Sequence, residues 1–289
     1  MRHADYIPDE LHFAYCYHVY FRWSTHRLRP HAPLARLDQQ TLGALAERFA
    51  LHVLVCDSIP TEVRTLVSLR PAESVSTCAS KLKGQTSRWL REALGLTQPL
   101  DLLSKGYFAC TSGKSESRQV EQYLSGQGEH HGYAGRVLPP AHVEDFDVTE
   151  TDEVRLQAKH AHAVLQFHVV LATWNRRGVF GTDEARAVVA AWRGLQAERR
   201  FALRKVSFVP DHVHIAARLH PAESPASLVV ALMNEAEKVI WERFPGAAIR
   251  AGVERLWQPS AYVGSFGDLA TPKVRKYLEN WAAGQKGGS

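Results

Sequence analysis

Two histidines separated by a single residue, His212 and His214, have the type and spacing needed to bind a metal ion. They lie in the stretch PDHVH (210–214), inside an apolar run from 205 to 219. Side chains alternate between the faces of a β-strand, so both imidazoles would project from one face, with Cα atoms roughly 7 Å apart. Two imidazoles placed in this way can close on one ion. On the triplet alone, two surface histidines on an edge strand explain the pattern equally well.

A tyrosine and a glutamine form a second candidate pair. Gln127 follows Tyr123 by four residues, and positions i and i+4 share one face of a helix. A phenol and an amide oxygen able to ligate a metal could therefore point at one place. A similar stretch near the C-terminus contains Tyr277, but the residue four positions later is Trp281, whose indole cannot ligate a metal.

The sequence contains two copies of one unit. The letters PAES at 71–74 recur at 221–224, and HV at 18–19 recurs at 168–169, both with a shift of 150 residues. Further on, VEQYL at 120–124 matches VRKYL at 274–278, now shifted by 154. A collinear series of this kind predicts a tandem duplication. In the same register the counterparts of His212 and His214 are Glu62 and Arg64, and an arginine offers no lone pair to a metal. One copy has kept the histidines, and the other has kept the tyrosine–glutamine pair.

Each copy predicts the same order of elements. We expect opening strands at 13–23 and 164–174, followed by helices at 38–51 and after Thr182, whose hydroxyl can cap the first turn. Strand pairs follow at 53–59 with 63–69 and at 202–209 with 212–219, and long helices begin at Ser74 and Ser224. Each copy then has a short strand, around Tyr107 or Tyr262, and a closing helix that carries Tyr123 or Tyr277. Antiparallel strands alternating with helices predict an α+β fold with helices on one sheet face. The predicted boundaries are 8–131 for unit one, 132–159 for a surface linker and 160–285 for unit two.

The composition of this 289-residue chain is that of a soluble protein, with 45% hydrophobic and 22% charged residues. No apolar run reaches the length of a membrane span, and no apolar signal core follows the N-terminus, so neither membrane insertion nor export is expected. Four cysteines without a Cys-x-x-Cys pattern fit a reducing cytoplasm: Cys16, Cys56, Cys78 and Cys110. The net charge of +5 tilts the protein modestly toward polyanions.

Taken together, these features resemble the single-tyrosine HUH transposases, the family of the REP-associated tyrosine transposases and their IS200-like relatives. The resemblance rests on YHVYFR at 17–22, LKG at 82–84 with SRWL at 87–90, YLSGQGEHH at 123–131, and PDHVH at 210–214. These stretches span nearly the whole chain outside the linker. The resemblance implies a ferredoxin-like sheet in each unit, with helices on one side. Because the family works as a homodimer of such units, the chain looks like a fused pseudo-dimer that is expected to be monomeric.

The resemblance also implies a composite active site, in which one unit supplies the histidines and the other supplies the tyrosine helix. In this chain His212, His214 and Gln127 would hold Mg²⁺ or Mn²⁺, and Tyr123 would attack. A site in cis that uses Tyr277 is the alternative. The implied activity is cleavage and rejoining of single-stranded DNA, often hairpin-bearing, through a 5′-phosphotyrosine. The second site would hold Glu62, Arg64, Tyr277 and Trp281, and is expected to be inactive.

Basic residues on the first long helix and after the second opening strand are predicted to bind DNA: Lys81, Lys83, Arg88, Arg91, Arg176 and Arg177. For Trp89, which lies among the first four, a core position is the alternative to stacking on a base. His18 and His168 are interpreted as structural residues that form hydrogen bonds.

Three other functions remain open. The first is a catalytically inactive regulator that binds DNA hairpins. The second is a replication initiator or relaxase, although these typically carry a lysine or second tyrosine one turn after the nucleophile, where this chain has Gly126. The third is a structural scaffold with a fortuitous histidine pair. The expected location is the bacterial cytoplasm, in association with the nucleoid.

Overall fold

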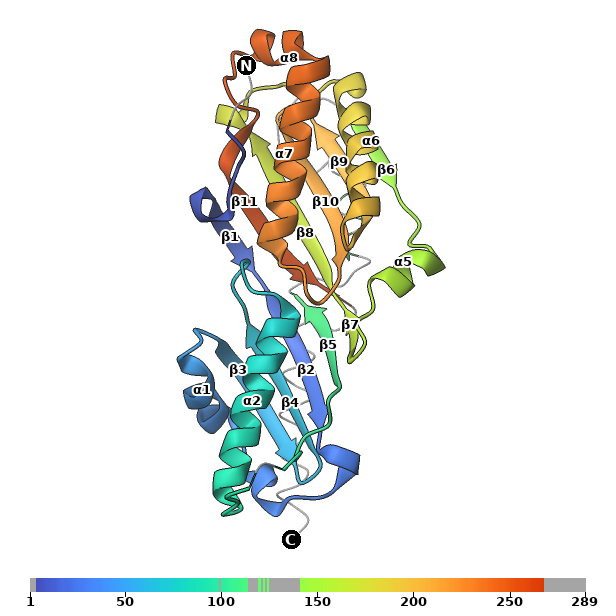
Figure 1. Ribbon diagram of the computed structural model, residues 1–289. Helices are drawn as coiled ribbons and strands as arrows, with labels where there is room; N and C mark the ends of the chain where they lie inside the picture. Colours follow the sequence, from blue (N-terminus) through green and yellow to red (C-terminus); the bar gives the residue numbers. More distant parts are fainter. Residues whose placement is uncertain are drawn as a thin grey trace.

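The computed structural model describes residues 4–98, 100–113, 119–120, 122, 124 and 141–267. The chain forms two sheets that lie end to end (Figure 1). The five-stranded sheet has the order β3-β4-β2-β5-β7, with β2 (His18–Ser24), β3 (His52–Ile59), β4 (Glu62–Ser68), β5 (Tyr107–Ser112) and β7 (Ala161–Val164). The six-stranded sheet has the order β1-β11-β8-β10-β9-β6, with β1 (His12–Cys16), β6 (His142–Asp145), β8 (Gln166–Thr173), β9 (Phe201–Val209), β10 (His212–Leu219) and β11 (Trp257–Phe266).

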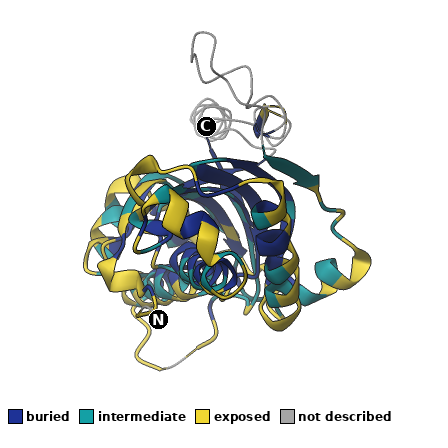
Figure 2. Ribbon diagram, turned by 90° about the horizontal axis from the view of Figure 1, so that it is seen from above, coloured by how far each residue is buried: buried dark blue, intermediate teal, exposed yellow. Residues whose placement is uncertain are grey.

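The described helices are α1 (Gln39–Glu47), α2 (Val75–Ala93), α5 (Glu150–Arg155), α6 (Thr182–Glu198), α7 (Pro225–Arg243) and α8 (Pro245–Ala251). The long helices α2, α6 and α7 lie on one side of the two sheets, and the buried strands form a layer above them in Figure 2. This is the predicted α+β architecture of two tandem ferredoxin-like units. None of the helices in the described ranges combines the length and the apolar character needed to cross a bilayer.

The helix starts follow from local capping. Ser74 caps α2 by accepting from the backbone N–H of Thr77, and Ser224 caps α7 by accepting from that of Ser227. The prediction that Thr182 caps its helix was wrong, because Thr182 is already the first helical residue. The cap position is Gly181, whose backbone N–H donates to Glu184 Oε2 at 3.1 Å.

Each predicted opening strand is in fact two strands that belong to different sheets. The strand is interrupted at Tyr17 in unit one and at Leu165 in unit two. The carbonyls of these two residues accept from the N–H groups of Leu69 and Leu219, respectively. The first part, β1, pairs in parallel with β11 of unit two, while β7 pairs in parallel with β5 of unit one. Each unit therefore covers an open edge of the other unit's sheet, which removes a row of unpaired backbone groups.

The repeated PAES turns also join the two units. The N–H of Ser76 donates to the carbonyl of Pro221 at 2.8 Å, and the N–H of Ala226 donates to that of Pro71 at 2.9 Å. Between these turns the ring of Tyr17 meets that of Phe167 edge-on, with centroids 5.1 Å apart. One continuous hydrophobic cluster runs through both units. The units are thus docked about a pseudo-twofold axis.

The described part of the predicted linker, residues 141–159, is more ordered than a surface linker. It contains β6, which pairs with β9 and extends the six-stranded sheet. It also contains α5, which begins with a capping box formed by Thr149 and Asp152. Arg155 of α5 donates to the carbonyls of Gln196 and Phe201, and so fastens this segment to unit two.

Candidate active site

The histidine pair lies at the centre of the unit-two sheet. Strand β10 is hydrogen-bonded on both sides, to β8 and to β9, so the interpretation of His212 and His214 as edge-strand residues does not hold. The two imidazoles share one face, with ring centroids 4.9 Å apart, and only 5% and 4% of the two residues is exposed. The alternate residues Val213 and Ile215 face the helices and are fully buried.

Neighbouring side chains orient both imidazoles. His212 Nδ1 lies 2.7 Å from Asp211 Oδ1, and Arg176 Nε lies 2.9 Å from the other oxygen of that carboxylate. Burial alone would raise the pKa of Asp211, but the hydrogen bond with His212 and the charge of Arg176 lower it below its ordinary value. The carboxylate therefore stays ionised, and it fixes the ring of His212 as metal-ligating histidines are commonly fixed.

The second imidazole is held by a third histidine. His214 Nδ1 lies 2.9 Å from His168 Nε2, and the two rings stack with centroids 5.2 Å apart. Burial lowers the pKa of His168 to about 4, so this ring is neutral at physiological pH. His168 was predicted only as a structural residue, and its contact with the histidine pair was missed. The match of His168 with His18 at a shift of 150 was also wrong, because the strand pairing relates β2 to β8 by 148 and makes Tyr20 the counterpart of His168.

These contacts fit a metal-binding pair. The Nδ1 atoms of both rings are engaged by Asp211 and His168, which makes the Nε2 atoms the candidate ligands. Nitrogen ligands bind at about 2.0–2.1 Å, so two rings at this separation can each offer one nitrogen to a common ion. Among the residues that the structure describes, no three His, Cys, Asp or Glu side chains gather as a metal site. Within those residues the two imidazoles are the only grouped candidates, and any further ligand would come from elsewhere in the chain.

Unit one carries an ion pair where unit two carries the histidines. Arg64 Nε lies 2.5 Å from Glu62 Oε1 on β4, and Arg22 Nε lies 3.7 Å from the other oxygen of Glu62. The residue that corresponds to Asp211 is Thr61, which cannot hold an imidazole in the same manner. Both the ligand positions and their support have therefore changed in unit one.

The segment that contains Tyr123 packs against unit two. Its described residues, Gln119, Val120, Gln122 and Leu124, are helical. Val120 and Leu124 are buried in a cluster with Ala216 and Phe266. Ala216 lies two residues after His214 on the same face of β10. A part of unit one thus covers the histidine face of the other unit. Several predicted residues lie outside the described part of the chain: Tyr123, Gln127, His130, His131, Tyr277 and Trp281.

Two glycines allow the chain to cross between the units. A Cβ on Gly113, directly after β5, would overlap the carbonyl oxygen of Ser265, and a Cβ on Gly267 would overlap that of Thr111. The two glycines are related by the same shift of 154 residues as the tyrosine stretches. Thr111 Oγ1 also donates to the carbonyl of Phe266 at 2.7 Å. Strands β5 and β11 therefore cross at backbone contact, which only glycine permits.

The predicted DNA-binding residues do not form one cluster, and most contact the chain itself. On α2, Lys81 pairs with Glu73 at 3.2 Å, Arg88 pairs with Glu92 at 3.0 Å, and Arg91 donates to the carbonyl of Ser87. Lys83 donates to the carbonyls of Ser104, Lys105 and Gly106 at 2.8–2.9 Å, which occupies its three N–H groups. Arg176 and Arg177 are exposed near the histidine pair, the former bound to Asp211. Trp89 packs partly buried against the core, as the alternative interpretation expects.

Comparison with known proteins identifies the class of this protein. The family model described as IS200-like transposase matches residues 12–127 and again 161–281. The ISDra2 transposase TnpA of Deinococcus radiodurans is 21% identical over 116 residues, which is 40% of this chain and 83% of TnpA. A crystal structure of a candidate transposase from D. radiodurans R1 is 22% identical, with a TM-score of 0.36, over 43% of this chain and 95% of the other.

The family match, which covers most of the chain, places it among the transposases, a class of DNA-cleaving enzymes. More specifically, it belongs to the family of IS200-like transposases, and it contains the family unit twice. Its partner class is therefore DNA. The predicted resemblance and the tandem repeat are both confirmed.

Proposed function

We propose that this protein cleaves and rejoins single-stranded DNA at one hybrid site, through a covalent 5′-phosphotyrosine on Tyr123. In this proposal unit two supplies His212 and His214, and unit one supplies Tyr123 and Gln127. The covalent link between the units replaces the dimer, so the active species is a monomer. A site in cis built on Tyr277 is the competing arrangement.

The packing of the tyrosine segment carries the proposal. Val120 and Leu124 bracket Tyr123 in the sequence, and both are buried against the strand face that bears His214. In unit one, by contrast, the Glu62–Arg64 ion pair occupies the ligand positions. Of the two equivalent strand positions, only the pair in unit two can therefore bind a metal. The tyrosine segment of unit one lies against the strand that carries that pair.

The residues divide the chemistry between them. A divalent cation, Mg²⁺ or Mn²⁺, would supply Lewis-acid polarisation of the scissile phosphate when held by His212, His214 and Gln127. The phenol oxygen of Tyr123 forms a bond to phosphorus, the bond from phosphorus to the 3′ oxygen breaks, and the 3′ oxygen takes the proton. Reversal of these steps rejoins the strand without ATP, because the phosphotyrosine keeps the energy of the broken linkage.

A covalent-trapping experiment tests the site. The protein is incubated with circular single-stranded phage DNA and Mn²⁺, and protein–DNA adducts are resolved on a denaturing gel. Wild type is expected to form adducts, whereas Tyr123→Phe and His212→Ala are not. Tyr277→Phe should behave as wild type. Tyr15→Phe, a change at an exposed tyrosine on β1, is the matched control for loss of a phenol.

The possible results separate the hypotheses. Adducts that persist in Tyr123→Phe but vanish in Tyr277→Phe would show that the site is built in cis. No adduct with any variant, together with retained DNA binding, would favour the catalytically inactive hairpin-binding regulator.

A further inference from the structure

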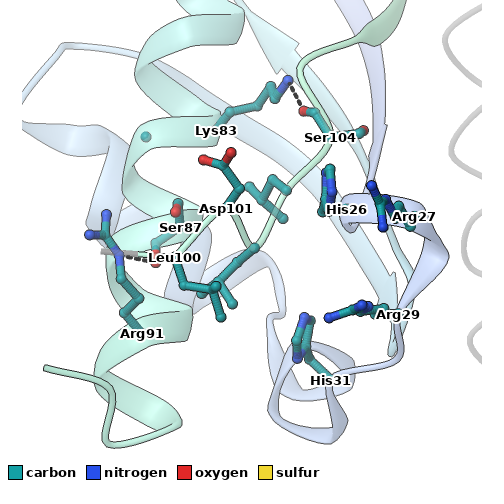
Figure 3. Close-up of a pocket in the computed structure, with 13 residues that line it drawn as sticks. His26, Arg27, Arg29, His31, Lys83, Ser87, Arg91, Leu100, Asp101 and Ser104 are labelled. Carbon is teal, nitrogen blue, oxygen red and sulfur yellow. Dashed lines mark hydrogen bonds between the residues drawn. The ribbon is translucent and has the colours of Figure 1, made fainter. Parts of the chain in front are cut away.

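A basic cavity of about 800 Å³ lies in unit one, far along the chain from the histidine pair. In Figure 3 its wall combines the C-terminal half of α2, the turn at 26–31 and the loop at 100–104. Arg27, Arg29 and His31 lie on one side and Arg91 lies on the other. Four lining residues are lysine or arginine and one, Asp101, is acidic, so the cavity favours an anion.

The equivalent place in unit two is filled by the chain itself. The ring of Tyr6, only 3% exposed, occupies it. The backbone N–H of Tyr6 donates to Asn234 Oδ1 at 2.7 Å, and its hydroxyl donates to Glu237 Oε2 at 3.0 Å. The backbone N–H of Trp257 donates to the same hydroxyl at 3.0 Å. The guanidinium of Arg255 lies over the ring, 3.8 Å from its centroid.

Through the internal repeat, the residues that contact Tyr6 in unit two correspond to residues that line the cavity in unit one. The two long helices align with a shift of 150, from Ser74 to Ser224, and the following strands align with a shift of 154. Equivalent hydrogen bonds agree with the second shift, from His26 N–H to the Leu102 carbonyl and from Trp174 N–H to the Leu256 carbonyl. The two donors follow β2 and β8, which the strand pairing relates by a shift of 148. The counterparts of Asn234, Glu237, Arg255 and Trp257 are Gly84, Ser87, Asp101 and Leu103. All four of these line the cavity.

The cavity is open because the corresponding arm of the chain goes elsewhere. Residues 4–11 precede β1 and place Tyr6 on α7. The segment that precedes β7 in the same way includes α5, which is bound to unit two through Arg155 and through the Glu153–Arg218 ion pair. Within the described ranges, the α2 helix of unit one therefore receives no such arm. A Cβ on Gly84 would meet nothing within 4 Å, so the space beside it is empty.

We propose that this cavity binds one nucleotide, with the base in the space that an aromatic ring fills in unit two and the phosphate on Arg27 and Arg29. The equivalent space in unit two holds a planar ring, and in unit one the space is rimmed by cations, which matches a base joined to a phosphate. Asp101 can accept from an exocyclic amino group, as acidic side chains accept from cytosine. The source of the nucleotide rests on the proposed function, which makes single-stranded DNA the expected source. A free nucleotide is the other source.

The proposal gives each chain one such nucleotide site. In unit two, Tyr6 occupies the ring position and the Glu237 carboxylate would repel a phosphate. The unit that lacks the histidine pair would therefore hold the DNA, and the unit that has the pair would hold the metal. A symmetric pair of units would instead bind two nucleotides.

A leucine placed at Gly84 tests the cavity with little expected cost in folding. Gly84→Leu fills the empty space from a helix position where glycine is unfavourable, so the melting temperature should not fall. Gly194→Leu is the matched control, because Gly194 is an exposed helix glycine of α6 that also has nothing within 4 Å of an added Cβ. Binding of a fluorescein-labelled 12-nucleotide single strand of mixed sequence is measured by anisotropy, without metal and in the Tyr123→Phe background, so that cleavage plays no part.

The expected loss in Gly84→Leu is about tenfold, because the leucine side chain takes the space proposed for the base, while Gly194→Leu binds as its parent. The double variant Arg27→Ala, Arg29→Ala should lower the slope of affinity against salt by roughly one, but Gly84→Leu should leave that slope unchanged. Titration of dCMP into the same proteins separates the sources. Binding of dCMP that Gly84→Leu abolishes assigns a free nucleotide, and an effect on the oligonucleotide alone assigns DNA. Equal binding of both probes by Gly84→Leu and Gly194→Leu overturns the proposal, even if the adducts on Tyr123 are found.

Discussion

The crossing of β5 and β11 gives a quantitative prediction about Gly113. In Gly113→Ala the added Cβ would overlap the carbonyl oxygen of Ser265. That oxygen belongs to a strand paired with both β1 and β8, so it cannot move without disturbing two ladders. Insertion of a single carbon into tightly packed surroundings costs about 1–3 kcal/mol, and a rigid backbone neighbour places this site at about 3 kcal/mol.

A loss of that size is readily measured. For domains of this size class each kcal/mol shifts the melting temperature by about 2–4 °C, so Gly113→Ala should melt about 6–12 °C below wild type. Differential scanning calorimetry provides the measurement, and Gly84→Ala and Gly194→Ala are matched controls in open helix positions. These two should melt at or slightly above the wild-type temperature, since alanine is the better helix former.

The same substitution also tests the hybrid site. The chain crosses at Gly113 just before the segment that packs on Ala216, so any displacement there moves the segment that carries Tyr123 in sequence. Adduct formation by Gly113→Ala at 20 °C should therefore fall even where the protein remains folded. A melting temperature within 2 °C of wild type would show that the two strands are not in backbone contact, and the account of how unit one reaches unit two would be wrong.

Three further outcomes are expected. Asp211→Asn should weaken Mn²⁺ binding about 10–100-fold by calorimetric titration, because it removes the carboxylate that orients His212, whereas Asp145→Asn at the exposed end of β6 should not. Thermal stability should fall as the pH drops below about 6.5, in part through His220. Burial and Arg200 lower the pKa of His220 in the folded protein, so the unfolded chain binds the proton first. His220→Gln should therefore make the melting temperature depend less on pH between pH 7.5 and pH 5. Arg155→Ala should destabilise the protein by about 1–3 kcal/mol in urea unfolding, because it leaves carbonyls at the end of α6 and the start of β9 without their donor.

The sequence predicted those features that depend on local rules and on the repeat. Ser74 and Ser224 cap their helices as expected, because a serine before an apolar helical run has one preferred partner, the N–H three residues on. The alternation in PDHVH placed both imidazoles on one face, as the strand period requires. The duplication appears in the sequence as matches at nearly constant shifts. The order of elements expected for one unit therefore predicted the order in the other.

The exchange of strands was beyond the sequence because nothing local marks it. Tyr17 and Leu165 are residue types common in strands, and at each the chain leaves one sheet and enters the other while its carbonyl accepts from a distant segment, at Leu69 and Leu219. The letters HVED at 142–145 likewise resemble an acidic loop, and they form β6 only because β9 offers an open edge. The matched glycines at 113 and 267 were the one available signal for the crossing.

Basic residues were the least predictable part of the candidate site. A lysine on a helix face is usually solvated, but Lys83 points inward and binds three consecutive carbonyls of the 104–106 loop. This contact depends on where the loop lies, which the helix pattern does not reveal. Arg176 likewise contacts the chain itself, because it forms an ion pair with Asp211 beside the histidine pair.

The crossing also explains why the two copies could lose different parts. In the proposed hybrid site the segment after Gly113 serves the histidines on β10, so the face of β4 in unit one would need no metal ligands. An isolated arginine at position 64 would be costly in this half-buried setting, and Glu62 beside it supplies the compensating charge. In that proposed site the fused chain keeps the retained parts together, because the unit-one segment and the strand with His212 and His214 belong to one polypeptide. In separate subunits the same substitutions would be inherited by both copies, and every site would be lost.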